Sequence, residues 1–529
     1  MVSREYDGLA GAGGVKDVCR QLAEAIVRQR KGNVRVVLPL YGFMDADQLG
    51  FRLLKLPVRK GCPTNKTSFL VDMNYPERER REEVSIWTKK MKGVQIYLLD
   101  AKRFREKMGV YTYTAEEEAA HAWQKQGNGH FDYFAMNILL QKATLALLIL
   151  LNHRPDIIHC HDGHGATLPA MMRELPGYRY FFSQTGAVVT IHNAGLGYHQ
   201  EVDDLDFARA VTGLPMAVIN TGRLAGNFDP FMAASNYAIL NTVSANYGRE
   251  LRETPEDSRT GWLGHELTQR RVTLAGITNG INADNYNPAK AGKLGLPAPF
   301  NPLSGELDGK RICKERMLVS CGKKHAWPTV EQFGHLKPEP EVPLFTFIGR
   351  LTSQKGVDIL LQAVPLLLEA DQVFHLLILG TGNPQLEQRL QRLSKTPATR
   401  GRICFLKGYD QALATQIYAA GDFFLVPSLY EPCGLTDFIA QLLGNLPIVH
   451  YVGGLVKVVD GKTGFTYQDH SPTALARTME KAIIMYNNEP DRLKKMQQQA
   501  IEQIHAQHTW DRVITKYLSL YTKAVGMCC

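Results

Sequence analysis

Apolar runs of strand length alternate with helical patterns through most of this 529-residue chain, and the alternation limits the folds open to it. One series of runs lies at 34–40, 94–99, 156–159 and 187–191, and a second lies at 344–348, 374–379, 403–406 and 423–426. Strands that alternate with helices form parallel sheets with helices on both faces. The sequence therefore predicts an α/β protein with two Rossmann-like domains.

The length supports this division, because 529 residues exceed what one ordinary hydrophobic core holds. A proline-rich stretch, 297–343, separates the two series of strands, and we place the boundary near its end. The prediction is an N-terminal domain at 1–340 and a C-terminal domain at 341–508. Residues 509–529 predict a helix that crosses back to the N-terminal domain.

Composition excludes several classes of function. The net charge of +9 is spread without dense basic clusters, which argues against nucleic-acid binding. Nine cysteines show no CxxC and no Cys/His cluster, so neither a disulfide framework nor a metal site is indicated. The N-terminus lacks an apolar signal region, and the apolar stretch 138–151 is too short to span a membrane. We expect a cytoplasmic protein with a buried helix at 138–151.

The segment 422–454 carries a carboxylate at the end of a predicted strand. The apolar run 423–426 leads into Ser-Leu-Tyr-Glu-Pro-Cys-Gly-Leu-Thr, in which Glu431 is the acid, and a helix is predicted over 437–443. Loops at the carboxyl ends of parallel strands are where ligands bind in open α/β sheets. Glu431 is therefore predicted to touch a ligand.

A second loop places two cations at a strand end. Residues 349–356 read Gly-Arg-Leu-Thr-Ser-Gln-Lys-Gly and follow the strand at 344–348, so Arg350 and Lys355 share one loop. Cations held there would stabilise the negative charge of a departing pyrophosphate. The alternative is a solvated loop with two surface cations.

Other motifs carry weaker signals. Gly13 and Gly14 lie in a glycine-rich turn before a helix, which suits either a phosphate cradle or a plain tight turn. Gly380 and Thr381 end the strand 374–379, as a nucleotide-facing turn or as simple punctuation. Polar groups that include His161 and Asn193 follow two strands of the first domain and suit sugar hydroxyls. We expect no metal site among them, and no hydrolase motif is present.

Taken in this order, the segments resemble the bacterial glycogen synthases and plant starch synthases, the ADP-glucose-dependent α-1,4-glucan glucosyltransferases of GT-B fold. The resemblance runs over nearly the whole chain and is most specific at 350–356 and 431–436. It implies two Rossmann-like domains that face each other across a cleft. It also implies ADP-glucose as donor, glycogen or another α-1,4-glucan as acceptor, no cofactor and no metal.

The resemblance further implies roles for individual residues. Arg350 and Lys355 would contact the donor phosphates, and His161 and Glu431 the transferred glucose. Asn193 would lie near the sugar or acceptor. The remaining donor-binding positions are Gly13, Gly14, Gly380, Thr381, Cys433, Gly434, Leu435 and Thr436. Such enzymes retain the anomeric configuration, and the departing phosphate helps to deprotonate the acceptor hydroxyl.

Five positions depart from the family pattern. Gly11 stands where the family has a lysine, Asp437 where it usually has glutamine, Tyr451 and Val452 in place of an arginine and a threonine, and Lys457 in place of an aspartate. These changes alter the charge of one pocket and leave the donor preference open. The alternatives are a GT-B glycosyltransferase with another donor, such as UDP-glucose, or acceptor, and a glucan-binding relative with little activity.

Overall fold

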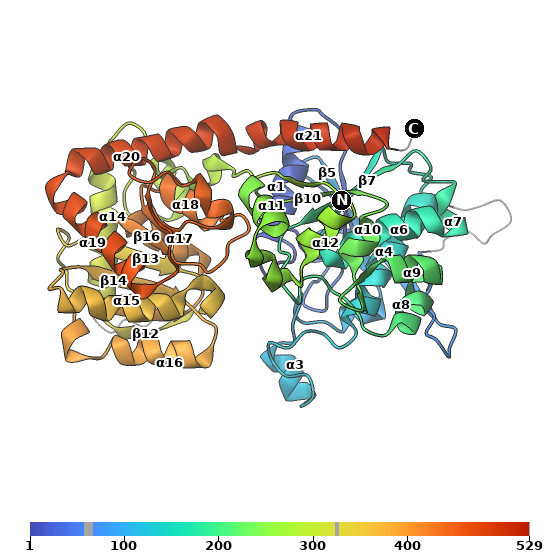
Figure 1. Cartoon of the computed structure of the whole chain (residues 1–529), viewed down its shortest axis with the longest axis horizontal. Coiled ribbons are helices and arrows are strands. Elements are labelled where there is room, and N and C mark those ends of the chain that lie inside the picture. Colours follow the sequence, from blue (N-terminus) through green and yellow to red (C-terminus); the bar gives the residue numbers. More distant parts are fainter. Residues whose placement is uncertain (58–66, 323–326, 528–529) are drawn as a thin grey trace. The chain divides into compact units, whose positions relative to one another are not determined.

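The computed structural model describes residues 1–57, 67–322 and 327–527. The chain forms two compact units, which Figure 1 colours along the sequence. Unit 1 contains Met1–Gly280 and Trp510–Cys529, and unit 2 contains Ile281–Thr509.

The division between the units differs from the boundary that we predicted at 340/341. Leu296, Phe300 and Leu318 pack in one apolar cluster with Leu344 and Ile348 of the second unit's sheet. The described residues of the proline-rich stretch therefore contribute to the core of unit 2 and do not form a linker.

The sheet of unit 2 has the strand order β12-β15-β14-β13-β16-β17-β18. Its strands are β12 (Val330–Gly334), β13 (Leu344–Ile348), β14 (His375–Gly380), β15 (Ile403–Gly408), β16 (Phe423–Val426), β17 (Leu446–His450) and β18 (Phe465–Tyr467). Neighbours pair in parallel from β15 to β18, as the sequence predicts, whereas β12 pairs antiparallel with β15. The antiparallel edge was not predicted.

Both faces of this sheet are buried, which explains its continuous apolar runs. Phe345 and Phe347 enter one apolar cluster, and Leu344 and Ile348 enter another. Alternate side chains of a strand point to opposite faces, so the two clusters lie on the two sides of the sheet. The covering helices include α14 (Asp308–Gly322), α15 (Val357–Glu369), α16 (Pro384–Leu393), α17 (Gln411–Ala420), α18 (Thr436–Leu442), α19 (Pro472–Asn488) and α20 (Pro490–Gln503).

The described residues of unit 1 contain two main sets of strands, ordered β1-β5-β4-β2 with β3 on β4, and β6-β7-β10-β11, and a short pair, β8 (Arg223–Leu224) with β9 (Asn227–Phe228). The strands are β1 (Arg35–Pro39), β2 (Arg52–Leu53), β3 (Ser68–Asp72), β4 (Arg81–Met91), β5 (Val94–Asp100), β6 (Ile157–His161), β7 (Gly186–Ile191), β10 (Ile239–Thr242) and β11 (Leu274–Gly276). The predicted strands pair in parallel, β1 with β5 and β6 with β7. The antiparallel strands β2, β3 and β4 were not predicted.

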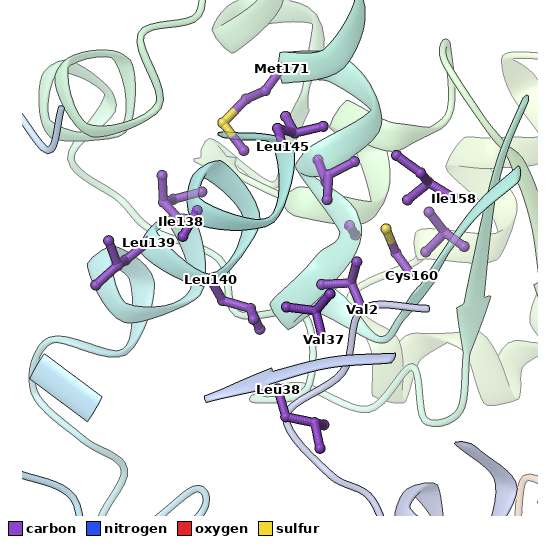
Figure 2. Close-up of a cluster of buried hydrophobic side chains, with 14 of the residues drawn as sticks. Val2, Val37, Leu38, Ile138, Leu139, Leu140, Leu145, Ile158, Cys160 and Met171 are labelled. Carbon is purple, nitrogen blue, oxygen red and sulfur yellow. The ribbon is translucent and has the colours of Figure 1, made fainter. Parts of the chain in front are cut away.

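The N-terminal residues join the two sets of strands. Val2 forms parallel bridges to Val37 of β1 and to Cys160 of β6. Figure 2 shows these three side chains in one apolar cluster with Ile138 and Leu140 of α4 (Tyr133–Leu150). The carboxyl ends of β1 and β6 therefore flank the glycine-rich turn that follows Val2.

Helix α4 is the one described helix that is long and apolar enough to cross a membrane, but 78% of it is buried inside unit 1. It covers the predicted buried helix at 138–151, and that prediction is confirmed. The long C-terminal helix α21 (Trp510–Gly526) also packs on unit 1: Trp510 Nε1 donates to Gln21 Oε1 of α1 (Val15–Arg28) at 2.8 Å, and Gly186 of β7 lies against the backbone of Ala524.

Candidate functional site

The Arg350 loop follows β13 at the carboxyl edge of the unit 2 sheet. Thr352 Oγ1 accepts the Lys355 amide at 3.3 Å and closes a short helical turn. Gly356 then adopts φ of +71°, and a side chain there would collide with the carbonyl of Pro427. This close approach, which only glycine permits, holds the loop against the end of β16.

Lys355 and Glu431 form an ion pair, and Ser428 Oγ donates a second hydrogen bond to the same carboxylate oxygen at 3.1 Å. Burial works to raise the pKa of Glu431, but the Lys355 ammonium outweighs it and holds that pKa below its usual value. Glu431 is therefore an ionised acceptor of hydrogen bonds near neutral pH, not an acid. Arg350 is exposed, and its guanidinium has no partner among the described residues.

A pair of glycines supports the loop that carries Glu431. The Gly454 amide donates to the Glu431 carbonyl at 2.8 Å. A side chain on Gly453 would meet the Glu431 carbonyl, and one on Gly454 would lie 2.5 Å from Cys433 Cα. The Gly453-Gly454 segment therefore packs directly against the backbone of residues 431–433.

Two of the residues that depart from the family pattern meet beneath this loop. Lys457 Nζ donates to the Gly434 carbonyl at 2.7 Å and to the Cys433 carbonyl, and lies 3.2 Å from Asp437 Oδ2. Both side chains are buried, with 7% of Lys457 and none of Asp437 exposed. Burial raises the pKa of Asp437 to about 6, and Lys457 opposes that rise.

The turn at Gly380 and Thr381 lies beside the Arg350 loop, because the Leu351 amide donates to the Thr381 carbonyl at 2.9 Å. Glu387 holds this turn by accepting the Thr381 hydroxyl at 2.7 Å and the Gly382 amide at 2.9 Å. The structure thus brings the predicted residues of the second domain to one edge of one sheet.

The candidate residues of unit 1 lie at the carboxyl ends of β6 and β7. His161 Nδ1 is 3.0 Å from His192 Nε2, and the Asp162 carboxylate accepts the His192 amide at 2.6 Å. Asp162 has φ of +54° and ψ of −178°, a strained conformation for a residue with a side chain. Burial lowers the pKa of His161 well below its usual value, so its imidazole is neutral.

Asn193 follows His192 and is half-buried. Its side-chain oxygen accepts the Gly195 amide at 2.8 Å and forms the turn after β7. It lies in the same cluster as His161, as the sequence predicts.

The glycine-rich turn holds a residue that sequence reasoning missed. Glu5 accepts the amides of Ala12 and Gly13 at 2.7 and 3.0 Å and the Tyr111 hydroxyl at 2.6 Å. The Glu5 carboxylate therefore already accepts the Gly13 amide that we predicted to contact phosphate, whereas Gly14 is the N-cap of α1. Glu5 lies three residues after Val2, whose bridges to β1 and β6 bring it beside this turn.

Lys16 takes up the space that Gly11 leaves. A side chain on Gly11 would collide with the methylene groups of Lys16, and the Lys16 ammonium lies 2.8 Å from Asp17 and 3.5 Å from Asp7. Lys16 is therefore neutralised by two carboxylates of unit 1. Tyr451, at another departing position, is 40% exposed after β17.

Comparison with known proteins agrees with this arrangement. The family model for the starch synthase catalytic domain matches residues 1–267, and that for glycosyl transferases group 1 matches 342–484. The glycogen synthase of Lacticaseibacillus casei is 30% identical over 97% of this chain and 96% of its own length. That of Aeromonas hydrophila is 29% identical over 99% of this chain and 98% of its own length.

Solved structures give the same result. The catalytic domain of starch synthase IV from Arabidopsis thaliana, bound to ADP and acarbose, superposes with a TM-score of 0.77 at 25% identity. The match covers 99% of this chain and 98% of that structure. Sucrose-phosphate synthase from Thermosynechococcus elongatus matches with a TM-score of 0.57 at 15% identity and covers 99% of this chain and 98% of its own, a likeness of fold alone. The two α/β units are those of a GT-B glycosyltransferase. The chain belongs to the starch synthase catalytic family, which confirms the predicted fold class and family.

Proposed function

We propose that this chain is a glycogen or starch synthase that transfers glucose from ADP-glucose to the non-reducing end of an α-1,4-glucan, with retention of configuration. The observation that carries the proposal is the Lys355–Glu431 ion pair at the carboxyl edge of the unit 2 sheet, with Arg350, whose guanidinium has no partner among the described residues, in the same loop as Lys355. Full-length similarity to glycogen synthases supports the same substrate class.

The proposed chemistry needs cations near the phosphates of the donor and a hydrogen-bond acceptor near its sugar. Arg350 and Lys355 stabilise the charge that develops on the departing diphosphate. Glu431, ionised because of Lys355, accepts hydrogen bonds from glucose hydroxyls, and the neutral imidazole of His161 binds a further hydroxyl. The leaving phosphate takes the proton of the acceptor hydroxyl, so no second carboxylate acts as in glycosidases.

The other predicted donor contacts belong to this proposal. Gly434, Leu435 and Thr436 offer backbone amides beside Glu431, and Gly380 and Thr381 border the Arg350 loop. Asn193 is assigned to the sugar or acceptor. The Gly13 amide donates to the Glu5 carboxylate at 3.0 Å. It can therefore bind the donor only after this hydrogen bond breaks. The proposal assigns no metal ion and no cofactor, and it places the enzyme in the cytoplasm.

A donor panel tests the proposal. Radiolabelled ADP-glucose, UDP-glucose and GDP-glucose are each incubated with glycogen and the enzyme, and label in precipitated glycogen is counted. We expect label from ADP-glucose to enter glycogen. An enzyme specific for α-1,4 linkages should then release that label. No incorporation from any donor, together with tight glycogen binding, would instead identify a glucan-binding relative.

The buried Asp437–Lys457 pair favours one second candidate, a transferase of the same fold that prefers another nucleotide sugar. This pair places an ammonium and a carboxylate beneath residues 433–436, which the donor is proposed to contact, where the family pattern has an aspartate and a glutamine. Competition by unlabelled UDP-glucose or GDP-glucose against labelled ADP-glucose separates the two candidates. Stronger competition by either than by unlabelled ADP-glucose would favour the second.

A further inference from the structure

The loop after Glu431 is held from below by one buried ammonium group. Lys457 Nζ donates to the carbonyl oxygens of Cys433 and Gly434 and pairs with the Asp437 carboxylate. Two of the three N–H donors of the ammonium bind these carbonyls, and Asp437 Oδ2 lies 3.2 Å from Nζ as its counterion. With 7% of its side chain exposed, the Lys457 ammonium is buried against the loop.

The two carbonyl bonds determine where the neighbouring amides point. The described peptide bonds include no cis bond, and in a trans peptide the N–H points opposite to the carbonyl of the preceding residue. Because the Cys433 and Gly434 carbonyls face Lys457, the N–H groups of Gly434 and Leu435 face away from it.

Both of these amides are available to a ligand. Within the described ranges, neither the Gly434 nor the Leu435 N–H has a hydrogen-bond partner, although Gly434 is buried. A buried N–H without a partner is uncommon and indicates that something else satisfies it. Gly434 has φ of +71°, the backbone conformation that successive amides adopt in anion-binding concavities.

We propose that Lys457 is a positioning residue, which orients the Gly434 and Leu435 amides toward the terminal phosphate of a nucleoside diphosphate, with Asp437 as its buried counterion. This inference rests on the proposed function, because it places the diphosphate of the sugar nucleotide beside Glu431. The Lys457–Asp437 pair is neutral, so its contribution is orientation of the loop and not added charge.

The test compares two nucleotides that differ by one phosphate. ADP and AMP are titrated by calorimetry into the full chain, into Lys457→Met, and into the double variant Lys457→Met/Asp437→Asn. The double variant is needed because Lys457→Met alone leaves a buried carboxylate without a partner, which destabilises proteins strongly. Lys462→Met, an exposed lysine of the same unit, is the matched control.

We expect the double variant to lose at least tenfold in ADP affinity and less than twofold in AMP affinity, while Lys462→Met matches the wild type. An equal loss of both nucleotides, or an unchanged ratio of their affinities, would overturn the proposal, as would a wild-type chain that binds ADP no more tightly than AMP. Nucleotide binding is measured without glucose transfer. Failure of the donor panel would therefore refute the proposed function, whereas the ratio of the ADP and AMP affinities would still test the role of Lys457.

Discussion

The imidazole rings of His161 and His192 stack with 5.2 Å between their centroids, and His161 Nδ1 lies 3.0 Å from His192 Nε2. This contact leaves the other nitrogen of His161, Nε2, buried without a partner among the described residues. Burial lowers the pKa of both histidines, that of His192 to about 3, so the pair is neutral at pH 7. A neutral ring with one unsatisfied nitrogen is suited to a sugar hydroxyl.

Replacement of His161 by glutamine should lower kcat/KM for the nucleotide sugar by about 100-fold, on the order of 3 kcal/mol, because a hydrogen bond to the reacting sugar is lost. The measurement is the initial rate of glucose transfer to glycogen. His121→Gln, at an exposed histidine of unit 1, is the control. If the His161 variant had the same kcat/KM as the control, the assignment of His161 to the site would be wrong.

Lys355→Ala and Glu431→Gln should each reduce turnover by roughly 100-fold or more, because each removes a group that acts on the reacting sugar nucleotide. Each change also breaks a largely buried ion pair, so the melting temperature should fall, and turnover is compared at a temperature at which both variants are folded. Lys462→Met serves as the control for Lys355. Turnover close to that of the wild type in either variant would contradict the assignment.

Chelation of metal ions should leave activity unchanged, because Arg350 and Lys355 are proposed to neutralise the diphosphate. Transfer rates are compared before and after dialysis against EDTA, with Arg350→Ala as the paired variant. We expect full activity after dialysis and a loss of about 100-fold in the variant. A rate that falls with EDTA and returns with Mg²⁺ would show that a metal supplies the charge.

The buried pair of His199 and Asp229 should make unit 1 less stable at high pH. Burial alone would lower the pKa of His199, but Asp229, 2.5 Å away, raises it to about 9. Because this folded-state pKa exceeds the unfolded value of about 6.5, the stabilisation is complete below pH 6.5 and is lost as pH rises through 9. The shift corresponds to at most ~3 kcal/mol.

Thermal melting at pH 6 and pH 9.5 measures this effect. The wild type should lose several degrees more than His199→Gln over that interval, because the variant has no imidazolium to lose. Parallel pH profiles of the two proteins would show that the pair does not titrate as described.

A fragment of residues 281–509 should fold by itself, whereas 341–509 should not. The longer fragment contains Lys310, whose ammonium donates to the carbonyls of Ala419 and Gly421 at 2.9 and 2.6 Å, and Lys314, which pairs with Asp422 at 2.6 Å. The shorter one exposes the apolar cluster that Leu318 covers. Circular dichroism melts of both fragments test this, and a cooperative melt of 341–509 would restore the predicted boundary.

The local pattern of residues was enough to predict the class of fold and the position of the candidate residues on it. Strand periodicity is local, so the runs at 344–348 and 423–426 became β13 and β16 with nearly the predicted bounds. Parallel strands align their carboxyl ends, and for this reason Arg350, Lys355 and Glu431 were predicted at one edge before any contact was known. Strand β4 was missed because its residues alternate between buried and exposed only in part.

Three features became visible only in the folded chain: the boundary at Gly280, the hydrogen bond from the Gly13 amide to the Glu5 carboxylate, and the Lys457–Asp437 pair beneath the loop after Glu431. Each feature depends on contacts between separate segments of the chain. Such contacts leave no periodic pattern in the sequence. Asp437 and Lys457 were visible as departures from a family pattern, but their charges compensate only because the chain after β17, which includes Gly453 and Gly454, folds back against residues 431–434. Burial and distance determine what these charges do, and neither can be read from the order of residues.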